Sequence, residues 1–226
     1  MVESRPASAG AATINRVVDT LRTRILEGAL SPGAALREVS MSAELAVSRN
    51  SLREALRSLT SEGLIVQEPN KGAAVRLLEA SDVRDIYRAR RALETQAVLE
   101  SSAADEDVFI AMEAAVAEKE RAERDRHWRA AGTASLRFHQ ALVSVLGSDR
   151  VNEFFNSVLA QLRLAWGRSC DEAEFQRGWA ERDRELLECL RQGRRTYSLG
   201  VLLLYLQDSE RQVLDELRRT TGNRGK

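Results

Sequence analysis

The distribution of proline constrains the fold of this 226-residue chain more than any other feature. Its three prolines, Pro6, Pro32 and Pro69, all lie in the first third, and no strand-like pattern follows about residue 80. Proline interrupts helices, so a long region without it, in which apolar residues recur at helical spacing, favours a run of helices. The chain is therefore expected to have a mixed N-terminal unit followed by an all-helical unit.

The N-terminal unit opens with a helical pattern. Apolar residues recur at helical spacing between residues 14 and 25, and Gly28 follows as a typical helix end. Pro32 and Gly33 then form a turn that interrupts helical structure. A second short apolar pattern comes next, and we expect Ser40 to cap this second helix.

A third helix and a hairpin complete the unit. Ser48 is expected to cap the third helix, and Gly63 ends it. Two strand-like runs, LIVQE and AAVRL, follow and are joined by residues 69–72, which are typical of a hairpin turn. The order helix, helix, turn, helix, hairpin predicts a winged helix-turn-helix over residues 13–78.

The second unit is predicted to be an antiparallel bundle of about six helices over residues 79–220, which makes the fold class mainly α. Its helical patterns lie near residues 82–102, 105–126, 128–146, 149–167, 174–192 and 196–219. The small, polar residues 1–12 show no periodicity and are expected to form a disordered arm, and residues 221–226 a disordered tail.

Composition is ordinary for a soluble globular protein. The chain has 34 basic and 34 acidic residues, so its formal net charge is zero. The overall charge therefore does not indicate a nucleic-acid partner. The longest apolar run, VLLLYL at residues 201–206, is far shorter than the roughly 18 residues that a membrane helix requires. Cys170 and Cys189 lie far apart and the first residues do not resemble a signal segment, which favours free thiols. We expect a soluble cytoplasmic protein without a membrane partner.

The third helix carries polar side chains opposite its apolar stripe. They are Arg49, Asn50, Arg53 and Arg57. Arginine can bind the two major-groove acceptors of guanine and asparagine suits adenine, while Ser48 and Ser51 add hydroxyls suited to a phosphate at a helix N-terminus. The alternative is a solvated face on which the arginines pair with acids of their own helix. The preceding short helix and the following hairpin favour DNA reading.

The segment LREVSMSAELAVSRNSLREALRSLTSEGLIVQEPNKGAAV resembles the N-terminal domain of GntR-type bacterial transcription regulators. DIYRARRALE at residues 85–94 is similar to the first helix of the ligand-sensing domain in the FadR-type subfamily, and the count of about six helices favours its VanR-like branch. The resemblance implies DNA contacts at Arg37, Ser48, Arg49, Asn50, Ser51, Arg53, Lys71 and Gly72. Family members often carry Thr-Pro where this chain has Asn50-Ser51.

The resemblance also raises the question of a metal. Many relatives hold a divalent ion in the bundle through an aspartate four residues before a histidine and two histidines on later helices. Here Ser135, Asp183 and Tyr205 stand in three of those places and only His139 remains. His127 is expected near a junction between helices, where it cannot easily complete the set. We therefore expect neither a metal nor another cofactor.

The same positions are expected to bind a small organic effector. His139, Ser135, Asp183 and Tyr205 would converge in the family fold, and Arg90 could pair with a carboxylate or phosphate of the ligand. Rather than a metal ligand, we expect His139 to be a pocket or core histidine whose ring nitrogens are satisfied by Ser135, Asp183 or Tyr205. The alternative for Arg90 is a surface arginine beside Arg88 and Arg91.

Taken together, these patterns predict a ligand-responsive, sequence-specific DNA-binding regulator, expected to be a repressor, that binds a palindromic operator as a homodimer. The expected partners are double-stranded DNA, a small effector and a second copy of the chain. An enzyme built on the helical bundle and a protein-interaction scaffold are the alternatives. The sequence shows no nucleophile–base pair, phosphate-binding loop or metal cluster, so we do not expect an enzyme.

Overall fold

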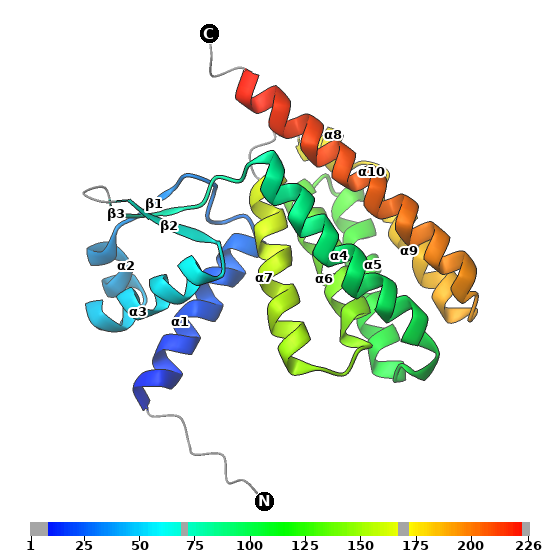
Figure 1. Cartoon of the computed structure of the whole chain (residues 1–226), viewed down its shortest axis with the longest axis horizontal. Helices are drawn as coiled ribbons and strands as arrows, with labels where there is room; N and C mark the ends of the chain where they lie inside the picture. The colour runs from blue at the N-terminus through cyan, green and yellow to red at the C-terminus, as the bar shows by residue number, and fades with distance from the viewer. Residues whose placement is uncertain (1–8, 69–71, 167–171, 223–226) are drawn as a thin grey trace, which may run out of the picture.

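The protein is described by a computed structural model over residues 9–68, 72–166 and 172–222. Helices dominate it, and the strands of the described residues form a small sheet in the N-terminal unit (Figure 1). The N-terminal unit lies on one side of the molecule and the helical bundle on the other, with the last helix along the far edge (Figure 1). The predicted fold class, a winged helix-turn-helix followed by a helical bundle, is confirmed.

The N-terminal unit has the expected order of helices and strands, with one extra strand. Its elements are α1 (Ala9–Leu26), β1 (Ala35–Leu36), α2 (Glu38–Glu44), α3 (Arg49–Ser61), β2 (Ile65–Glu68) and β3 (Gly72–Val75). The first helix begins at Ala9. The sequence pattern placed the start of this unit later, at residue 13. Alanine has the highest helix propensity, so the segment AGAA can extend the helix without contributing to the apolar stripe.

The core of this unit lies where α1 packs against α3. The buried apolar side chains are Val17, Val18, Leu21 and Ile25 from α1 and Leu52, Ala55, Leu56 and Leu59 from α3. Their spacing of three or four residues places them on one face of each helix, which is why both helices fold against each other. The opposite face of α3 is thereby left to solvent.

One of the two predicted caps is correct. Ser48 is the N-cap of α3, and its Oγ accepts a hydrogen bond of 3.0 Å from the backbone N–H of Ser51. The prediction for Ser40 is wrong, because α2 begins at Glu38 with Arg37 as N-cap. Ser40 lies inside the first turn, and its hydroxyl donates to the carbonyl oxygen of Arg37 instead. The unforeseen strand β1 explains the early start, since it brings the chain to Arg37 already in extended form.

The sheet has the order β1-β3-β2 and is antiparallel throughout. Its central strand, β3, pairs Val75 with Ile65 and Gly72 with Glu68, which confirms the predicted hairpin. The backbone of β1 pairs with the other edge of β3. The turn residues 69–71 lie outside the described residues.

The helical unit contains α4 (Ala80–Glu100), a short 3₁₀ helix η1 (Ser101–Ala103), α5 (Glu106–Arg124), α6 (Trp128–Ser144), α7 (Asp149–Trp166), α8 (Glu172–Gln176), α9 (Trp179–Arg191) and α10 (Arg195–Gly222). The helix expected near residues 174–192 is divided into α8 and α9. Gly178 breaks it with a φ of +86°, a backbone conformation that other residues rarely adopt.

The bundle is arranged around α6. Helix α5 packs against α6 and α9, α7 packs against α6 and α4, and α10 lies along α4 and α9 (Figure 1). Among the described residues, no helix is both long and apolar enough to cross a membrane.

The two units contact each other through α1, α3 and α7. The Arg22 guanidinium binds both carboxylate oxygens of Glu62, the C-cap residue of α3, at 2.9 and 2.7 Å. From α7, the Ser157 hydroxyl donates to the same carboxylate and Gln161 donates to the Glu62 carbonyl oxygen. The end of α3 is thus bound directly to the bundle.

Candidate functional site

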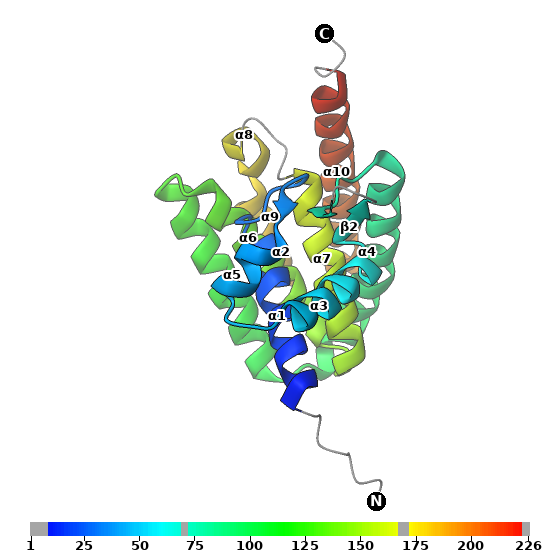
Figure 2. The same ribbon diagram turned by 90° about the vertical axis from the view of Figure 1, so that its left-hand side faces the viewer.

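The N-terminal turns of α3 form an exposed polar surface. Arg49, Asn50 and Arg53 are exposed, while the leucines on the other face are buried. Helices α2 and α3 lie on the side of the molecule away from α9 and α10, so the bundle does not cover this surface (Figures 1 and 2). The predicted outward orientation of these residues agrees with the structure.

The arginines of this surface differ in their partners. Arg53 Nε lies 2.8 Å from Glu38 Oε2 on α2, and Arg57 pairs with Glu54 one turn away. Within the part of the chain that the structure describes, the side chains of Arg49 and Asn50 form no hydrogen bond or ion pair. Arg49 can therefore bind a new partner without giving up an existing one, whereas Arg53 must exchange Glu38.

The other residues expected to contact DNA surround α3. Ser48 and Ser51 share a hydroxyl–hydroxyl hydrogen bond of 2.9 Å at the helix N-terminus. Arg37 is exposed at the start of α2, and Gly72 begins β3 at the base of the wing. Lys71, the predicted wing-tip cation, lies outside the described residues.

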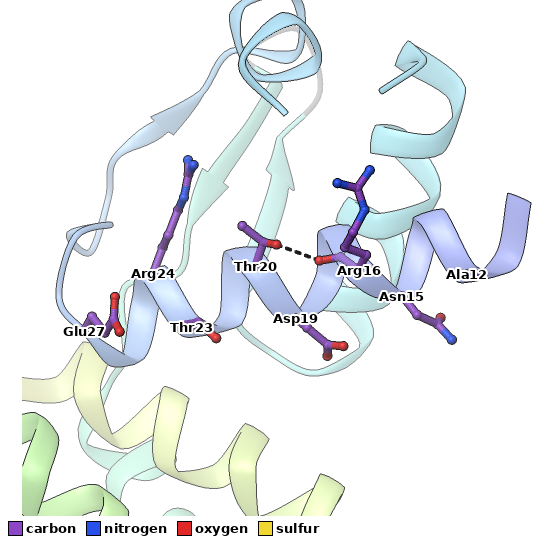
Figure 3. A pocket seen from close by; sticks show the side chains of 8 residues that line it. All are labelled: Ala12, Asn15, Arg16, Asp19, Thr20, Thr23, Arg24 and Glu27. Carbon is purple, nitrogen blue, oxygen red and sulfur yellow. Dashed lines mark hydrogen bonds between the residues drawn. The ribbon is translucent and has the colours of Figure 1, made fainter. Parts of the chain in front are cut away.

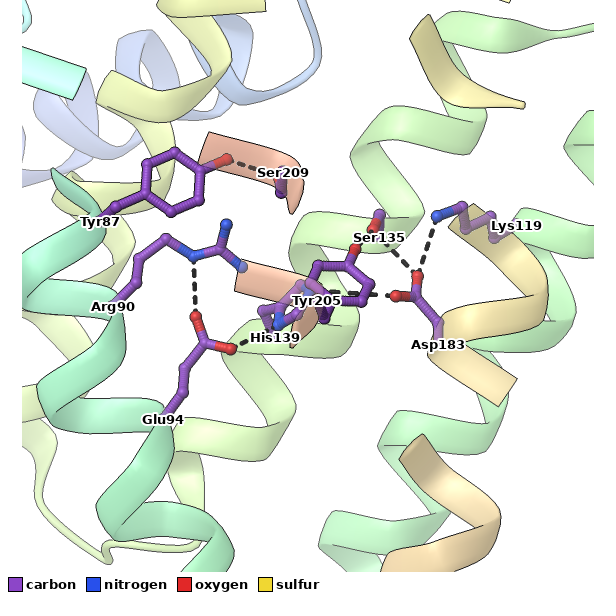
Figure 4. A network of polar contacts seen from close by, with 9 residues as sticks. All are labelled: Tyr87, Arg90, Glu94, Lys119, Ser135, His139, Asp183, Tyr205 and Ser209. Atoms are coloured by element: carbon purple, nitrogen blue, oxygen red, sulfur yellow. Dashed lines mark hydrogen bonds and ion pairs between the residues drawn. The ribbon is translucent and has the colours of Figure 1, made fainter. Parts of the chain in front are cut away.

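The five residues expected to bind an effector lie in one buried cluster inside the bundle (Figure 4). Arg90 comes from α4, Ser135 and His139 from α6, Asp183 from α9 and Tyr205 from α10, and none is more than 5% exposed. The Ser135 hydroxyl lies 2.9 Å from Asp183 Oδ2 and 3.2 Å from the Tyr205 hydroxyl. The Tyr205 ring packs edge-on against His139, with the ring centroids 4.8 Å apart. The alternative of a surface Arg90 is wrong.

Two further members of the cluster were not predicted. Glu94 accepts a hydrogen bond from Arg90 Nε at 2.8 Å, and its other oxygen lies 2.6 Å from His139 Nδ1. Lys119 of α5, whose side chain is 0% exposed, donates from Nζ to Asp183 Oδ2 at 2.9 Å. The spacing of four residues between Arg90 and Glu94 was a usable signal. Nothing in the sequence marked Lys119, because a lysine in an amphipathic helix normally faces water.

Burial and charge set the protonation states within the cluster. Burial acts to raise the pKa of Glu94, but the nearby Arg90 and His139 outweigh it and lower that pKa below its ordinary value. Burial and the Asp183 charge raise the pKa of Tyr205 well above its ordinary value, so the phenol remains a neutral hydrogen-bond donor. Burial likewise raises the pKa of Tyr87, whose hydroxyl bonds Ser209 and whose ring lies under Arg90.

Three polar atoms of the cluster lack a hydrogen-bond partner among the described residues. They are Arg90 Nη2, His139 Nε2 and Asp183 Oδ1. His139 Nε2 and Asp183 Oδ1 lie 3.9 Å apart, beyond hydrogen-bond range. Buried polar atoms are normally satisfied, so such a group points to a ligand or water that the fold is built to hold. The set offers one donor, one acceptor and one imidazole nitrogen.

A divalent metal ion does not fit this donor set. No group of three or more His, Cys, Asp or Glu side chains suited to a metal gathers within the described residues. Both oxygens of Glu94 are occupied by Arg90 and His139, and Asp183 Oδ2 is occupied by Lys119 and Ser135. A metal of this kind needs three or four nitrogen, sulfur or carboxylate ligands, which His139 and one oxygen of Asp183 do not supply.

Two surface hollows offer a comparison with the cluster. One runs along α1, and its lining side chains, including Arg16, Asp19 and Arg24, come from that helix and from Glu27 directly after it (Figure 3). It is the exposed polar face of a helix. The other is a half-open groove of about 570 Å³ between α9 and α10, lined by Tyr197 and Tyr205 among others. Because Tyr205 also belongs to the cluster, the groove adjoins the cluster from the solvent side.

Family models match both units of the chain. Residues 13–75 match the model described as bacterial regulatory proteins of the gntR family, and residues 85–196 match the FCD domain. A solved structure described as a GntR transcriptional regulator from Rhodococcus sp. RHA1 is 31% identical, with a TM-score of 0.82 over 90% of this chain and 98% of that one. The chain belongs to the GntR family. This result confirms the resemblance seen in the sequence.

Curated relatives match the chain over part of its length. The Nta operon transcriptional regulator of Aminobacter aminovorans is 48% identical over 67 residues, which cover 30% of this chain and 32% of that protein. The gluconate operon transcriptional repressor of Bacillus licheniformis is 41% identical over 85 residues, which cover 38% and 35%. The chain thus spans about a third of the length of these relatives. They are regulators rather than enzymes, which agrees with the expectation that this chain is not an enzyme.

Proposed function

We propose that this GntR-family protein is a sequence-specific DNA-binding regulator of transcription. The observation that carries the proposal is the exposed Arg49–Asn50 end of α3, capped by Ser48 and displayed on a winged helix-turn-helix. In this fold the N-terminal turns of the third helix enter the major groove. A capped helix holds its first turn in a fixed orientation, so the direction in which Arg49 extends is set before DNA binds.

Arg49 and Arg53 would read bases, while the surrounding residues would hold phosphates. A planar guanidinium can donate two hydrogen bonds to guanine, and Asn50 can pair with adenine in the same way. Arg37, Ser48, Ser51, Lys71 and Gly72 would contact the backbone on either side of the groove. Arg53 can bind DNA only after it leaves Glu38, because its Nε lies 2.8 Å from Glu38 Oε2. The contact with DNA must therefore replace this ion pair.

The buried cluster is the proposed effector site. A small organic molecule that presents an acceptor to Arg90 and a donor to Asp183 would satisfy two of the three unpartnered atoms, and a contact with His139 Nε2 would satisfy the third. Ser135 and Tyr205 would complete its lining. The gluconate operon relative is a repressor, which supports the same role for this chain, with the effector controlling release from DNA.

The protein would act as a homodimer. A single winged domain contacts too little DNA for high specificity, whereas two domains related by a twofold axis read both halves of a palindrome. Leu203 and Leu204 of α10 are 41% and 61% exposed at the edge of the bundle, where a second copy could cover them. The bundle, residues 80–226, would hold the two copies together.

Substitution of Arg49 tests the proposal. Arg49→Ala should weaken binding to a duplex selected by the unaltered protein by about 1–3 kcal/mol and change binding to random duplex far less. The matched control is Arg88→Ala, which removes an exposed arginine of α4 that is far from α3 in the sequence and should leave both affinities unchanged. Fluorescence anisotropy at two salt concentrations measures all of these affinities. Equal losses on both duplexes would show that Arg49 contacts only phosphate.

A further inference from the structure

A lysine with no exposed surface is the least expected member of the cluster. Lys119 extends from α5 toward Asp183 on α9, and its Nζ donates to Asp183 Oδ2 (Figure 4). Burial of an ammonium group is costly unless the charge is paired and hydrogen bonded. The position of Lys119 therefore depends on Asp183, and the carboxylate in turn has a fixed positive charge beside it.

The ion pair occupies the part of the cluster where a metal would have to bind. Ser135, His139, Asp183 and Tyr205 are the residues that stand in the metal-ligand places of relatives, and the structure brings them together. Lys119 contacts this group through the same Asp183 oxygen that Ser135 binds. Any cation bound by Asp183 would therefore lie close to an ammonium that is already there.

We infer that the Lys119 ammonium is the permanent cation of the proposed effector site and takes the place of a divalent metal ion. The inference rests on the proposed function only in calling the cluster an effector site, since the exclusion of metal concerns the cluster itself. Lys119 pairs with Asp183 and Arg90 with Glu94, so each buried carboxylate already has a cation from the chain. Ligands would then be held by hydrogen bonds and ion pairs rather than by chelation.

The inference is tested by thermal unfolding of the full-length protein with Zn²⁺ and with a chelator. The wild-type Tm should be unchanged by excess Zn²⁺ or by EDTA, and elemental analysis should find much less than one metal ion per chain. Ser135→Asp combined with Lys119→Met removes the ammonium and provides two carboxylates beside His139. Zn²⁺ should raise the Tm of this double variant by several degrees.

The matched control is Ser135→Asp alone. Lys119 remains in this variant and can pair with both carboxylates, so Zn²⁺ should change its Tm much less than that of the double variant. Equal responses in the two variants would show that Lys119 does not exclude the metal. If the double variant does not fold, Ser135→Asp combined with Lys119→Gln replaces it, because glutamine removes the positive charge and keeps a hydrogen-bond donor toward Asp183. One tightly bound metal per wild-type chain, lost in His139→Ala, would overturn the inference.

These measurements use no DNA and no effector. If the protein failed to bind DNA while Zn²⁺ raised the Tm of the double variant alone, the proposed function would be wrong and the role of Lys119 would be supported. If wild-type protein bound Zn²⁺ at His139 and still recognised DNA, the inference about Lys119 would be wrong and the proposed function as a DNA-binding regulator would be supported.

Discussion

At the scale of single residues, Glu94 connects Arg90 and His139 within the proposed effector site. One of its oxygens fixes Arg90 and the other lies against His139 Nδ1, so a single carboxylate orients two of the three groups that have unpartnered atoms. A carboxylate on Nδ1 leaves His139 Nε2 to face the rest of the cluster. The geometry of the site therefore depends on the negative charge of Glu94.

Glu94→Gln should lower the free energy of unfolding at pH 7 by about 3 kcal/mol, because it leaves Arg90 buried without its ion-pair partner. The pH dependence has a definite sign. The folded-state pKa of Glu94 is below its unfolded value, so its contribution is fully present above an ordinary pKa of about 4.3 and is lost as the pH falls through the lower folded value. Wild type should therefore lose more stability in acid than Glu94→Gln.

Urea unfolding at pH 7 and in acid measures this difference. The control is Glu100→Gln on the exposed end of the same helix, where we expect a change within about 0.5 kcal/mol. Identical stabilities of Glu94→Gln and Glu100→Gln at pH 7 would show that the buried pair contributes nothing.

The sequence predicts some of these residues because their signals are local. Ser48 is recognisable as a cap from the polar start of a leucine-striped helix, and the exposure of Arg49 follows from helical spacing. Arg90, His139 and Asp183 were found through the family resemblance. Lys119 could not be found in either way, since its burial depends on α9 bringing Asp183 beside it. Long-range pairing of this kind leaves no periodic trace in the sequence.

At the scale of elements, the boundaries that failed depended on contacts between distant segments. Ser40 was placed as a cap because β1, a strand of two residues that exists only by pairing with β3, was not foreseen. The division at Gly178 was missed because a single glycine inside a helical pattern is often tolerated. By contrast, the leucine stripes of α1 and α3 predicted both helices, since burial alone determines them.

The contact between α3 and α7 should transmit changes between the bundle and α3, the proposed DNA-reading helix. Gln161→Ala combined with Ser157→Ala removes the two hydrogen bonds from α7 to Glu62, each worth about 1 kcal/mol net. Amide hydrogen exchange at residues 60–64 should become faster while exchange in α9 stays the same. The control Gln96→Ala alters an exposed amide of α4 and should change neither. Unchanged exchange at residues 60–64 would show that Arg22 alone holds the end of α3.

At the scale of the whole molecule, the proposed DNA-binding surface and the proposed effector site lie in different units. The N-terminal unit places α3 on one side, and the bundle buries its polar cluster and leaves α10 at the opposite edge (Figure 1). A dimer formed by the bundle would present two copies of α3 to one face of a duplex. Binding sites for such a dimer have two half-sites related by a twofold axis and spaced by about 34 Å or a multiple of it.

Selection of bound sequences from a random duplex library tests the central claim most directly. The full-length protein, at physiological salt, should enrich a palindromic motif whose half-sites contain a guanine that is no longer selected by Arg49→Ala. The two half-sites should lie about one helical turn apart between centres. A library that stays random after repeated rounds, or a motif that Arg49→Ala selects unchanged, would contradict DNA reading by α3.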